Sequence, residues 1–149
     1  MANSALTSAV AAAAPVPLPK CILIVEDNPL NMKLFSAMIA AQGYEVLQAA
    51  DGAQGLELAQ QRHPDLIIMD IQLPSMSGLD VTRNLKADEA TKGIPIIATT
   101  AFAMRGDEEM ILASGCDAYM SKPIAISQFL ELIETFMLQV PDISEFAPE

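Results

Sequence analysis

Short runs of β-branched and other apolar residues alternate along this chain with longer segments in which apolar residues recur every three or four positions. Runs of the first kind are typical of buried strands, and periodic segments of the second kind are typical of amphipathic helices. The predicted strands are residues 21–25, 44–48, 66–69, 94–99 and 118–120. The predicted helices are residues 29–42, 52–62, 77–87, 105–113 and 127–138.

The first and last predicted helices indicate which of their faces is buried. In the first, the side chains expected to face the sheet are Leu34, Phe35, Met38 and Ile39, with Gly43 ending the helix. The side chains then left towards solvent are Leu30, Met32, Ala37, Ala40 and Ala41. In the last helix the inward side chains are Phe129, Leu130, Ile133, Phe136 and Met137. The first helix therefore offers a weakly polar surface suited to contact with a helix bundle.

Regular alternation of strands and helices predicts the α/β class, with a doubly wound, five-stranded parallel sheet, right-handed crossovers and helices on both faces. Ligands of such sheets bind outside the carboxyl ends of the strands, where the strand order reverses. Candidate functional residues are therefore expected at that edge.

Composition and charge narrow the function classes. A chain of 149 residues with 52% hydrophobic residues is long enough for one domain with one core, and too apolar for global disorder. Its apolar runs are shorter than the ~20 residues that cross a bilayer, so we expect no membrane insertion. A net charge of -11 disfavours direct binding to nucleic acids or anionic lipid. Cys21 and Cys116 lack metal-ligand spacing and are interpreted as reduced thiols in or near the core.

The two ends of the chain differ in composition from the middle. Residues 1–19 are rich in Ala and Pro and lack the basic start of a signal peptide, so we expect a flexible extension and a cytoplasmic protein. Residues 140–149 form an acidic tail that is expected to be disordered. The domain itself is predicted to span residues 20–139. Because the last helix runs directly into the tail, no output domain is expected, and the output would be binding to other proteins.

Polar side chains stand where several of the predicted strands end. Asp70 follows an apolar run directly, and its carboxylate is expected to be presented to solvent rather than buried. Glu26 and Asp27 follow the first strand in the same way. The fourth strand leads to Thr100, and the fifth is soon followed by Lys122. Because parallel strands share one carboxyl edge, these side chains are expected to converge.

The converging acids predict a divalent-metal site. Mg²⁺ prefers oxygen ligands and is usually held by one or two carboxylates, a requirement that Glu26, Asp27 and Asp70 meet. Carboxylates crowd unfavourably without a cation, so either a bound ion or Lys122 is expected beside them.

The same residues suit phosphoryl chemistry. An aspartate can act as the nucleophile towards phosphorus, and catalysis then reduces to positioning and positive charge. Mg²⁺ and Lys122 would contact two phosphoryl oxygens. The Thr100 hydroxyl would contact the third, together with a backbone N–H that follows Asp70 or belongs to Ala101.

Over residues 20–138 the chain resembles the response-regulator receiver domains of bacterial two-component signalling, the CheY-like superfamily. The motifs that carry the resemblance are Val25-Glu26-Asp27-Asn28, Met69-Asp70-Ile71-Gln72-Leu73-Pro74 with Ser77-Gly78, Thr99-Thr100-Ala101 and Ser121-Lys122-Pro123. Further segments at 28–32, 100–107 and 115–119 are similar to the single-domain DivK-type regulators of alphaproteobacterial cell-cycle control. The resemblance implies the flavodoxin-like strand order 2-1-3-4-5.

The resemblance also implies a role for each residue of the metal site. Asp70 is the implied phosphoacceptor, which takes a phosphoryl group from a histidine kinase in a Mg²⁺-dependent reaction. Glu26 and Asp27 form the implied acidic pocket. The implied direct metal ligands are Asp27, Asp70 and the Gln72 carbonyl.

Other matching residues are implied to form a switch. Thr100 and Lys122 are the implied phosphoryl sensors, and Ala101 follows Thr100 in the same motif. Tyr119 is the aromatic residue expected to change rotamer, and the Lys122–Pro123 peptide is expected to be cis. Such a protein is a regulator rather than an enzyme, because it catalyses only its own phosphoryl transfer and autodephosphorylation. Its expected partners are a histidine kinase or phosphatase helix bundle and downstream signalling proteins.

Other functions stay open from the residues alone. An aspartyl-phosphate hydrolase of the haloacid dehalogenase type also uses Mg²⁺ and a strand-end Asp, but it places a second acid where this chain has Gln72. A flavodoxin-like flavin carrier needs a phosphate loop rich in Ser, Thr and Gly where this chain has Glu26 and Asp27. A degenerate receiver that serves only for docking would be expected to lack some of the site residues, all of which are present here.

Overall fold

The computed structural model of the protein describes residues 20–101 and 105–138. Its strands are β1 (Cys21–Val25), β2 (Glu45–Ala49), β3 (Leu66–Asp70), β4 (Ile96–Thr100) and β5 (Ala118–Ser121). Its helices are α2 (Pro29–Ala41), α3 (Gly52–Arg62), α4 (Gly78–Ala87), α5 (Arg105–Ala113) and α6 (Ile126–Met137). The predicted extension and tail lie outside the described residues. Among the helices of the described ranges, none combines the length and hydrophobicity needed to span a membrane.

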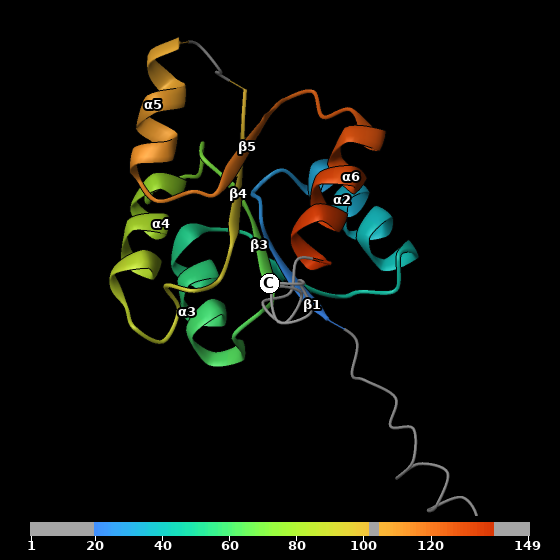
Figure 1. Ribbon diagram of the computed structural model, residues 1–149, viewed down its shortest axis with the longest axis horizontal. Coiled ribbons are helices and arrows are strands. Elements are labelled where there is room, and N and C mark those ends of the chain that lie inside the picture. Colours follow the sequence, from blue (N-terminus) through green and yellow to red (C-terminus); the bar gives the residue numbers. More distant parts are fainter. Residues whose placement is uncertain (1–19, 102–104, 139–149) are drawn as a thin grey trace, which may run out of the picture.

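The strands form one parallel sheet in the order β2-β1-β3-β4-β5, as predicted. Figure 1 shows α2 and α6 on one side of the sheet and α3, α4 and α5 on the other. The strand order reverses between β1 and β3, which are hydrogen-bonded neighbours. The topology therefore brings the acidic exits of these two strands together at one edge of the sheet.

The observed elements begin and end within two residues of the predicted bounds. β4 begins at Ile96 rather than at Ile94, because the Ile94 N–H closes a turn onto the Thr91 carbonyl and Pro95 has no N–H to donate. β3 extends one residue further than predicted and includes Asp70. The carboxyl end of β3 thus becomes part of the functional site itself.

The central strands are buried on both faces, as in other parallel sheets covered by helices. Leu23 and Val25 belong to the core layer that includes side chains from α3, α4 and α5. Ile22 and Ile24 belong to the layer that includes side chains from α2 and α6. The two core layers hold the central strands between them, and with them the positions of the residues that follow each strand.

The inward face of α6 is confirmed. Its buried side chains are Phe129, Ile133 and Met137, and its partly buried ones include Leu130 and Phe136. The Phe129 ring packs against Phe35 of α2, with the ring centroids 5.1 Å apart.

The predicted inward face of α2 is only partly confirmed. Phe35 and Ile39 are buried, but the prediction for Leu34 is wrong, because its side chain is 46% exposed. Positions 35 and 39 share one face of the helix, and position 34 is turned from 35 by about 100°. Met32, expected towards solvent, packs partly against the core instead. The outer face of α2 therefore presents Leu34 to solvent where the prediction had placed Met32.

Candidate functional site

Carboxylates from two neighbouring strands meet at the carboxyl edge of the sheet. Glu26 and Asp27 follow β1, Asp70 ends β3, and one carboxylate oxygen of each lies within 4.8 Å of the others. Asp27 is exposed, whereas Glu26 and Asp70 are each only 2% exposed. The predicted convergence of these acids is confirmed, but the expectation that Asp70 is presented to solvent is wrong.

The loop after β3 packs closely on the backbone of Asp70. Asp70 pairs with Thr99 in the ladder between β3 and β4, so its backbone still lies inside the sheet. The loop then folds back, with the Gly78 N–H donating to the Ile71 carbonyl at 3.0 Å. A Cβ atom at position 78 would collide with the Asp70 carbonyl oxygen, so this close approach requires glycine. The backbone of Asp70 therefore lies beneath its own loop.

Lys122 places one cation among the carboxylates. Its Nζ lies 3.1 Å from Glu26 Oε1 and 3.3 Å from Asp70 Oδ2, which confirms the prediction that Lys122 lies close to the acids. One ammonium compensates the three clustered carboxylates only in part. The remaining negative charge favours a bound divalent cation.

Burial is the main influence on the ionisation of Asp70. Desolvation raises the pKa of its carboxyl to about 6, and the charge of Glu26 acts in the same direction. The Lys122 ammonium opposes this shift, as does the Gln72 N–H, which donates to Asp70 Oδ1 at 3.0 Å. Asp70 is therefore ionised at neutral pH, but it holds its proton more tightly than an exposed aspartate would.

The Gln72 side chain reaches from the loop after β3 to the end of β4. Its Nε2 donates to Thr100 Oγ1 at 2.9 Å, and its Oε1 accepts from the Ala101 N–H at 3.1 Å. Thr100 is 1% exposed, and its carbonyl accepts from the Lys122 N–H at 2.7 Å. Sequence reasoning missed the Gln72 contacts, because the partners lie 28 and 29 positions away and no periodic pattern connects them.

The other predicted switch residues lie on β5 and directly after it. Tyr119 packs partly against the core layer beside α5, and its pKa is raised chiefly by the hydrogen bond of its hydroxyl to Glu108 of α5. The Lys122–Pro123 peptide is cis, as predicted. The rotamer change of Tyr119 stays a prediction.

Two features lie apart from the acidic cluster. Cys21 and Cys116 are free thiols, partly buried and buried respectively, as predicted.

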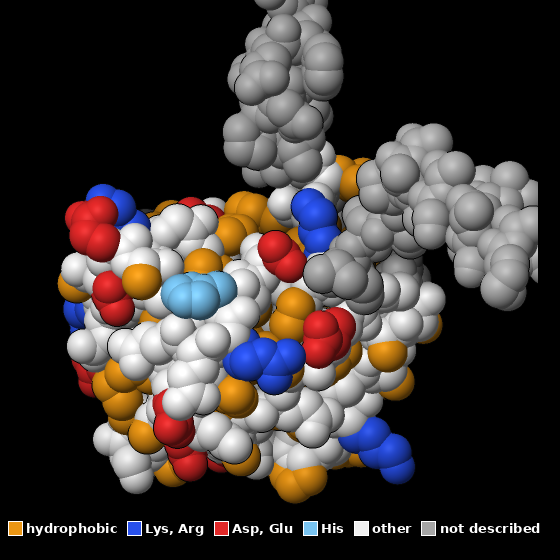
Figure 2. Space-filling view, turned by 90° about the horizontal axis from the view of Figure 1, so that it is seen from below, with side chains coloured by type: hydrophobic (Ala, Val, Ile, Leu, Met, Phe, Trp, Pro, Cys, Tyr) orange, Lys and Arg blue, Asp and Glu red, His pale blue; other side chains and the backbone are white. Residues whose placement is uncertain are grey.

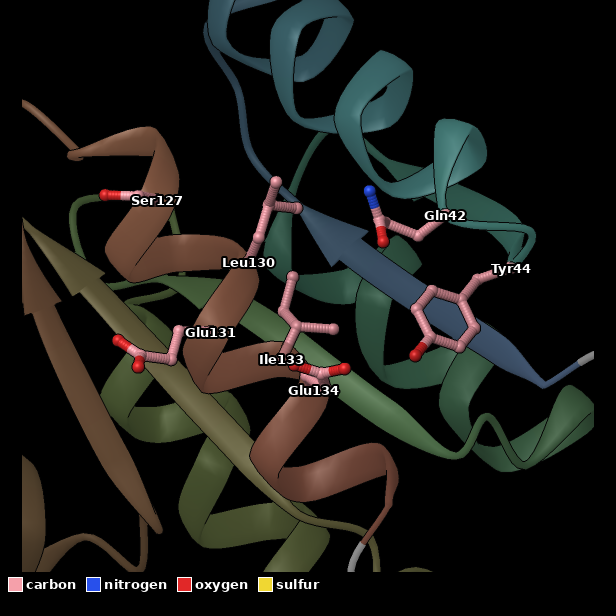
Figure 3. A pocket seen from close by; sticks show the side chains of 7 residues that line it. All are labelled: Gln42, Tyr44, Ser127, Leu130, Glu131, Ile133 and Glu134. Atoms are coloured by element: carbon pink, nitrogen blue, oxygen red, sulfur yellow. The ribbon is translucent and has the colours of Figure 1, made fainter.

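A hollow of about 350 Å³ lies between α6, the end of α2 and the residue before β2 (Figure 3). Its lining consists of Gln42, Tyr44, Ser127, Leu130, Glu131, Ile133 and Glu134, so it shares no residue with the cluster.

Comparison with known sequences decides the family. Residues 22–134 match the response regulator receiver domain. The chain belongs to this family. It is 55% identical over 120 residues to the polar-differentiation response regulator DivK of Brucella ovis, covering 80% of this chain and 98% of that protein. The DivK protein of Brucella anthropi is 54% identical with the same coverage.

Solved structures of receiver domains share the fold. The receiver domain of the sensor histidine kinase PA1611 from Pseudomonas aeruginosa PAO1 is similar with a TM-score of 0.76 and 36% identity, covering 82% of this chain and 100% of that one. It holds a magnesium ion coordinated in its active-site cleft. The chemotaxis protein CheY4 of Vibrio cholerae has a TM-score of 0.76 and 26% identity, over 80% of this chain and 99% of that one.

The residues of the acidic cluster fit a magnesium ion. Mg²⁺ takes oxygen ligands and retains several waters, so it suits a cluster in which buried acids adjoin an exposed one. Glu26 and Asp70 supply the buried oxygens, and Asp27 leaves the cluster accessible from solvent. Membership of the receiver family gives no support to the haloacid dehalogenase and flavodoxin alternatives.

Proposed function

We propose that the protein is a single-domain response regulator of a phosphorelay, which accepts a phosphoryl group on Asp70 from a histidine kinase in a Mg²⁺-dependent reaction. The observation that carries this proposal is the buried Asp70 carboxylate, which shares one site with Glu26, Asp27 and Lys122. The match to the receiver family supports the same conclusion.

In the proposed reaction, an Asp70 carboxylate oxygen attacks the phosphorus of a phosphohistidine. The new O–P bond forms as the P–N bond breaks, and the imidazole leaves with the electron pair. Lys122, 3.3 Å from Asp70 Oδ2, is positioned to stabilise negative charge on the phosphoryl oxygens. When bound, Mg²⁺ supplies further positive charge to those oxygens. Asp27, Asp70 and the Gln72 carbonyl are its proposed ligands, with Glu26 beside them.

The proposed switch passes from the phosphoryl group through β4 and β5. The Thr100 hydroxyl and the Ala101 N–H are the groups proposed to bind a phosphoryl oxygen, which draws the end of β4 towards Asp70. Tyr119 then turns into the vacated space and leaves its bond to Glu108. Such coupling typically amounts to ~1–3 kcal/mol, so partner affinity is expected to change by a finite factor.

We propose that the face of α2 beside Lys122 docks the helix bundle of the kinase or phosphatase. A groove of about 420 Å³ lies there, lined by Asn31, Leu34, Phe35, Met38, Lys122, Pro123 and Ile124. Leu30 is 73% exposed and, with Leu34, extends the apolar surface from this groove. Lys122 belongs both to the lining of this groove and to the phosphoryl site. A kinase docked in the groove would therefore hold its phosphohistidine close to Asp70.

A role in cell-cycle or cell-fate control completes the proposal. The DivK proteins to which the chain is similar are named polar-differentiation response regulators, which supports such a role. The protein would act by binding downstream signalling proteins, and autodephosphorylation would return it to the resting state. Direct binding to DNA is disfavoured by the net charge of -11.

The proposal is tested by incubating the protein with acetyl phosphate and locating the phosphoryl group by mass spectrometry. We expect modification of one residue, Asp70, that requires Mg²⁺ and is lost in EDTA and in Asp70→Asn. Modification of another residue, or a phosphoryl group that persists in Asp70→Asn, would contradict the proposal.

A further inference from the structure

The Gln72 amide already occupies the groups that the proposed function assigns to phosphoryl binding. Its Oε1 lies 3.1 Å from Ala101 N, and its Nε2 lies 2.9 Å from Thr100 Oγ1. A backbone N–H can only donate, so the amide atom that faces Ala101 must be the oxygen. This fixes the orientation of the amide and makes Thr100 Oγ1 an acceptor of the Nε2 proton.

We propose that this amide, with its bonds to Thr100 and Ala101, is a clasp that stabilises the unphosphorylated state. The inference rests on the proposed function, because it supposes that a phosphoryl group forms on Asp70. A phosphoryl oxygen that binds the Ala101 N–H takes the place of Gln72 Oε1, so the clasp must open first. Gln72 is thus a positioning residue that sets how much binding energy the phosphoryl group must supply.

The clasp is connected to the phosphoacceptor through its own backbone. The Gln72 N–H donates to Asp70 Oδ1 at 3.0 Å, so one residue bonds both the reacting carboxylate and the end of β4. A change in the charge or rotation of the Asp70 carboxylate therefore changes a bond at the base of the Gln72 side chain. Gln72 therefore connects the phosphoacceptor Asp70 to Thr100 directly, by one hydrogen bond of its backbone and one of its side chain.

The surroundings leave room for the clasp to open. A cavity of about 90 Å³ lies against Gln72 and Thr100, and Asp107, Met110 and Ile111 of α5 form part of its wall. Its volume is about three times the share that one molecule has in liquid water. Asp107 brings a carboxylate to the cavity wall, and a carboxylate can accept an N–H from the released amide. Opening therefore need not leave the amide without a polar partner.

The clasp is expected to weaken the binding of a phosphoryl group, because the two compete for the same hydrogen-bonding groups. Each neutral hydrogen bond contributes a factor of about 2 to 10 to an equilibrium constant, and bonds to a charged acceptor are roughly twice as strong in free energy. The phosphoryl group therefore displaces Gln72, but its net binding is weaker than with the clasp absent. Removing the clasp is expected to tighten binding of a phosphoryl analogue by about fivefold.

The test compares wild type with Gln72→Met, which retains the side-chain length and the backbone carbonyl but forms neither clasp bond. The matched control is Gln48→Met, because Gln48 Nε2 also donates to a hydroxyl, Ser36 Oγ at 2.8 Å, on β2 and α2 away from the site. The probe is beryllofluoride with Mg²⁺, an analogue of a phosphoryl group on a carboxylate. Its apparent dissociation constant is measured by calorimetric titration, and amide hydrogen exchange at Ala101 is measured without it.

We expect Gln72→Met to bind beryllofluoride about fivefold more tightly than wild type and to exchange its Ala101 amide faster, while Gln48→Met matches wild type in both. A general loss of structure would weaken binding, so the expected gain separates the clasp from a merely structural role. Unchanged or weaker binding by Gln72→Met would overturn the clasp and leave the proposed function standing. Absence of beryllofluoride binding in wild type, or binding that persists in Asp70→Asn, would overturn the proposed function and the clasp with it.

Discussion

The two edges of the same sheet both carry acidic side chains, but they use them differently. At the amino edge, where the strands begin, carboxylates hold strand N–H groups. Asp117 Oδ2 accepts from the Ile96 N–H at 2.8 Å and from Lys86 Nζ at 3.1 Å. Asp65 Oδ2 accepts from the Cys21 N–H at 2.8 Å. Figure 2 views the molecule from the end where the strands begin, and acidic and basic side chains are interspersed there.

At the carboxyl edge the acids lie close together, and their negative charge is only partly balanced by positive charge. Lys122 is the cation found beside Glu26, Asp27 and Asp70 in the described part of the chain, and two of these acids are buried. Lys86, by contrast, donates to the Ile94 and Lys92 carbonyls as well as to Asp117. The charges and hydrogen-bonding groups around Lys86 are satisfied within the protein. The acids around Lys122 keep an excess of negative charge, which a bound cation would neutralise. Unmatched buried charge, rather than the presence of acids, therefore distinguishes the functional edge.

The largest expected contrast between the two lysines concerns signalling. Lys122→Met is expected to retain Mg²⁺ binding but to lose the amide chemical-shift changes over α5 and β5 that phosphorylation causes, since the cation links the phosphoryl group to the residues after β5. This coupling is typically about 5-fold to 150-fold in affinity. The amide chemical-shift changes are measured from NMR spectra with and without acetyl phosphate. Lys86→Met is the control, and equal responses in both variants would refute the distinction.

A second contrast concerns stability. Lys86→Met is expected to lower the free energy of unfolding by ~2 kcal/mol whether or not Mg²⁺ is present, because its carbonyl and carboxylate acceptors lose a shared donor. Lys122→Met is expected to be less stable than wild type in EDTA, because buried Glu26 and Asp70 lose their cation, and Mg²⁺ should reverse much of the loss. Urea unfolding of both variants measures these effects. A loss in Lys86→Met that Mg²⁺ reverses would contradict the account.

Asp27→Ala separates metal binding from folding at the carboxyl edge. We expect roughly tenfold weaker Mg²⁺ binding, but no fall in melting temperature in EDTA, because one of the crowded carboxylates is removed. Calorimetric titration and thermal melts measure the two properties. A variant that melts lower than wild type in EDTA would show that the acids do not repel one another appreciably.

A further expected effect is the pH dependence of the metal-free protein. The Asp70 pKa of about 6 lies above the ordinary value of 3.8, so the folded state binds this proton more tightly than the unfolded state. Its contribution to stability is therefore fully present below about pH 4 and is lost as the pH rises through about 6. Urea unfolding in EDTA is expected to show this loss in wild type and not in Asp70→Asn. The same slope in both proteins would assign the titration to another group.

Much of the fold and the convergence of the site follow from sequence. Strands that alternate with helices fix a parallel sheet, and a parallel sheet places every strand exit at one edge. The sequence alone therefore predicts that Glu26, Asp70 and Lys122 lie close together. The motifs that resemble receiver domains predict the strand order itself, and the observed order agrees with this prediction.

The remaining features depend on contacts that no local pattern encodes. Asp70 is buried at a strand end where the loop to Gly78 packs on its backbone, and a strand end does not reveal the path of the next loop. Periodicity places Leu34 on the wrong face because apolar residues occur on both faces of α2, where the pattern is ambiguous. The reach of Gln72 to Thr100 depends on how β3 and β4 are set side by side, which is a tertiary property.

The contrast between the two edges is tested most directly by substituting one aspartate at each. Asp70→Asn and Asp117→Asn remove the same charge from the carboxyl and amino edges respectively, and each is assayed for Mg²⁺ binding and for modification by acetyl phosphate. We expect Asp117→Asn to be modified like wild type and to bind Mg²⁺ equally well. Asp70→Asn should not be modified and should bind Mg²⁺ at least tenfold more weakly. Modification of Asp70→Asn, or its loss in a folded Asp117→Asn protein, would contradict the account.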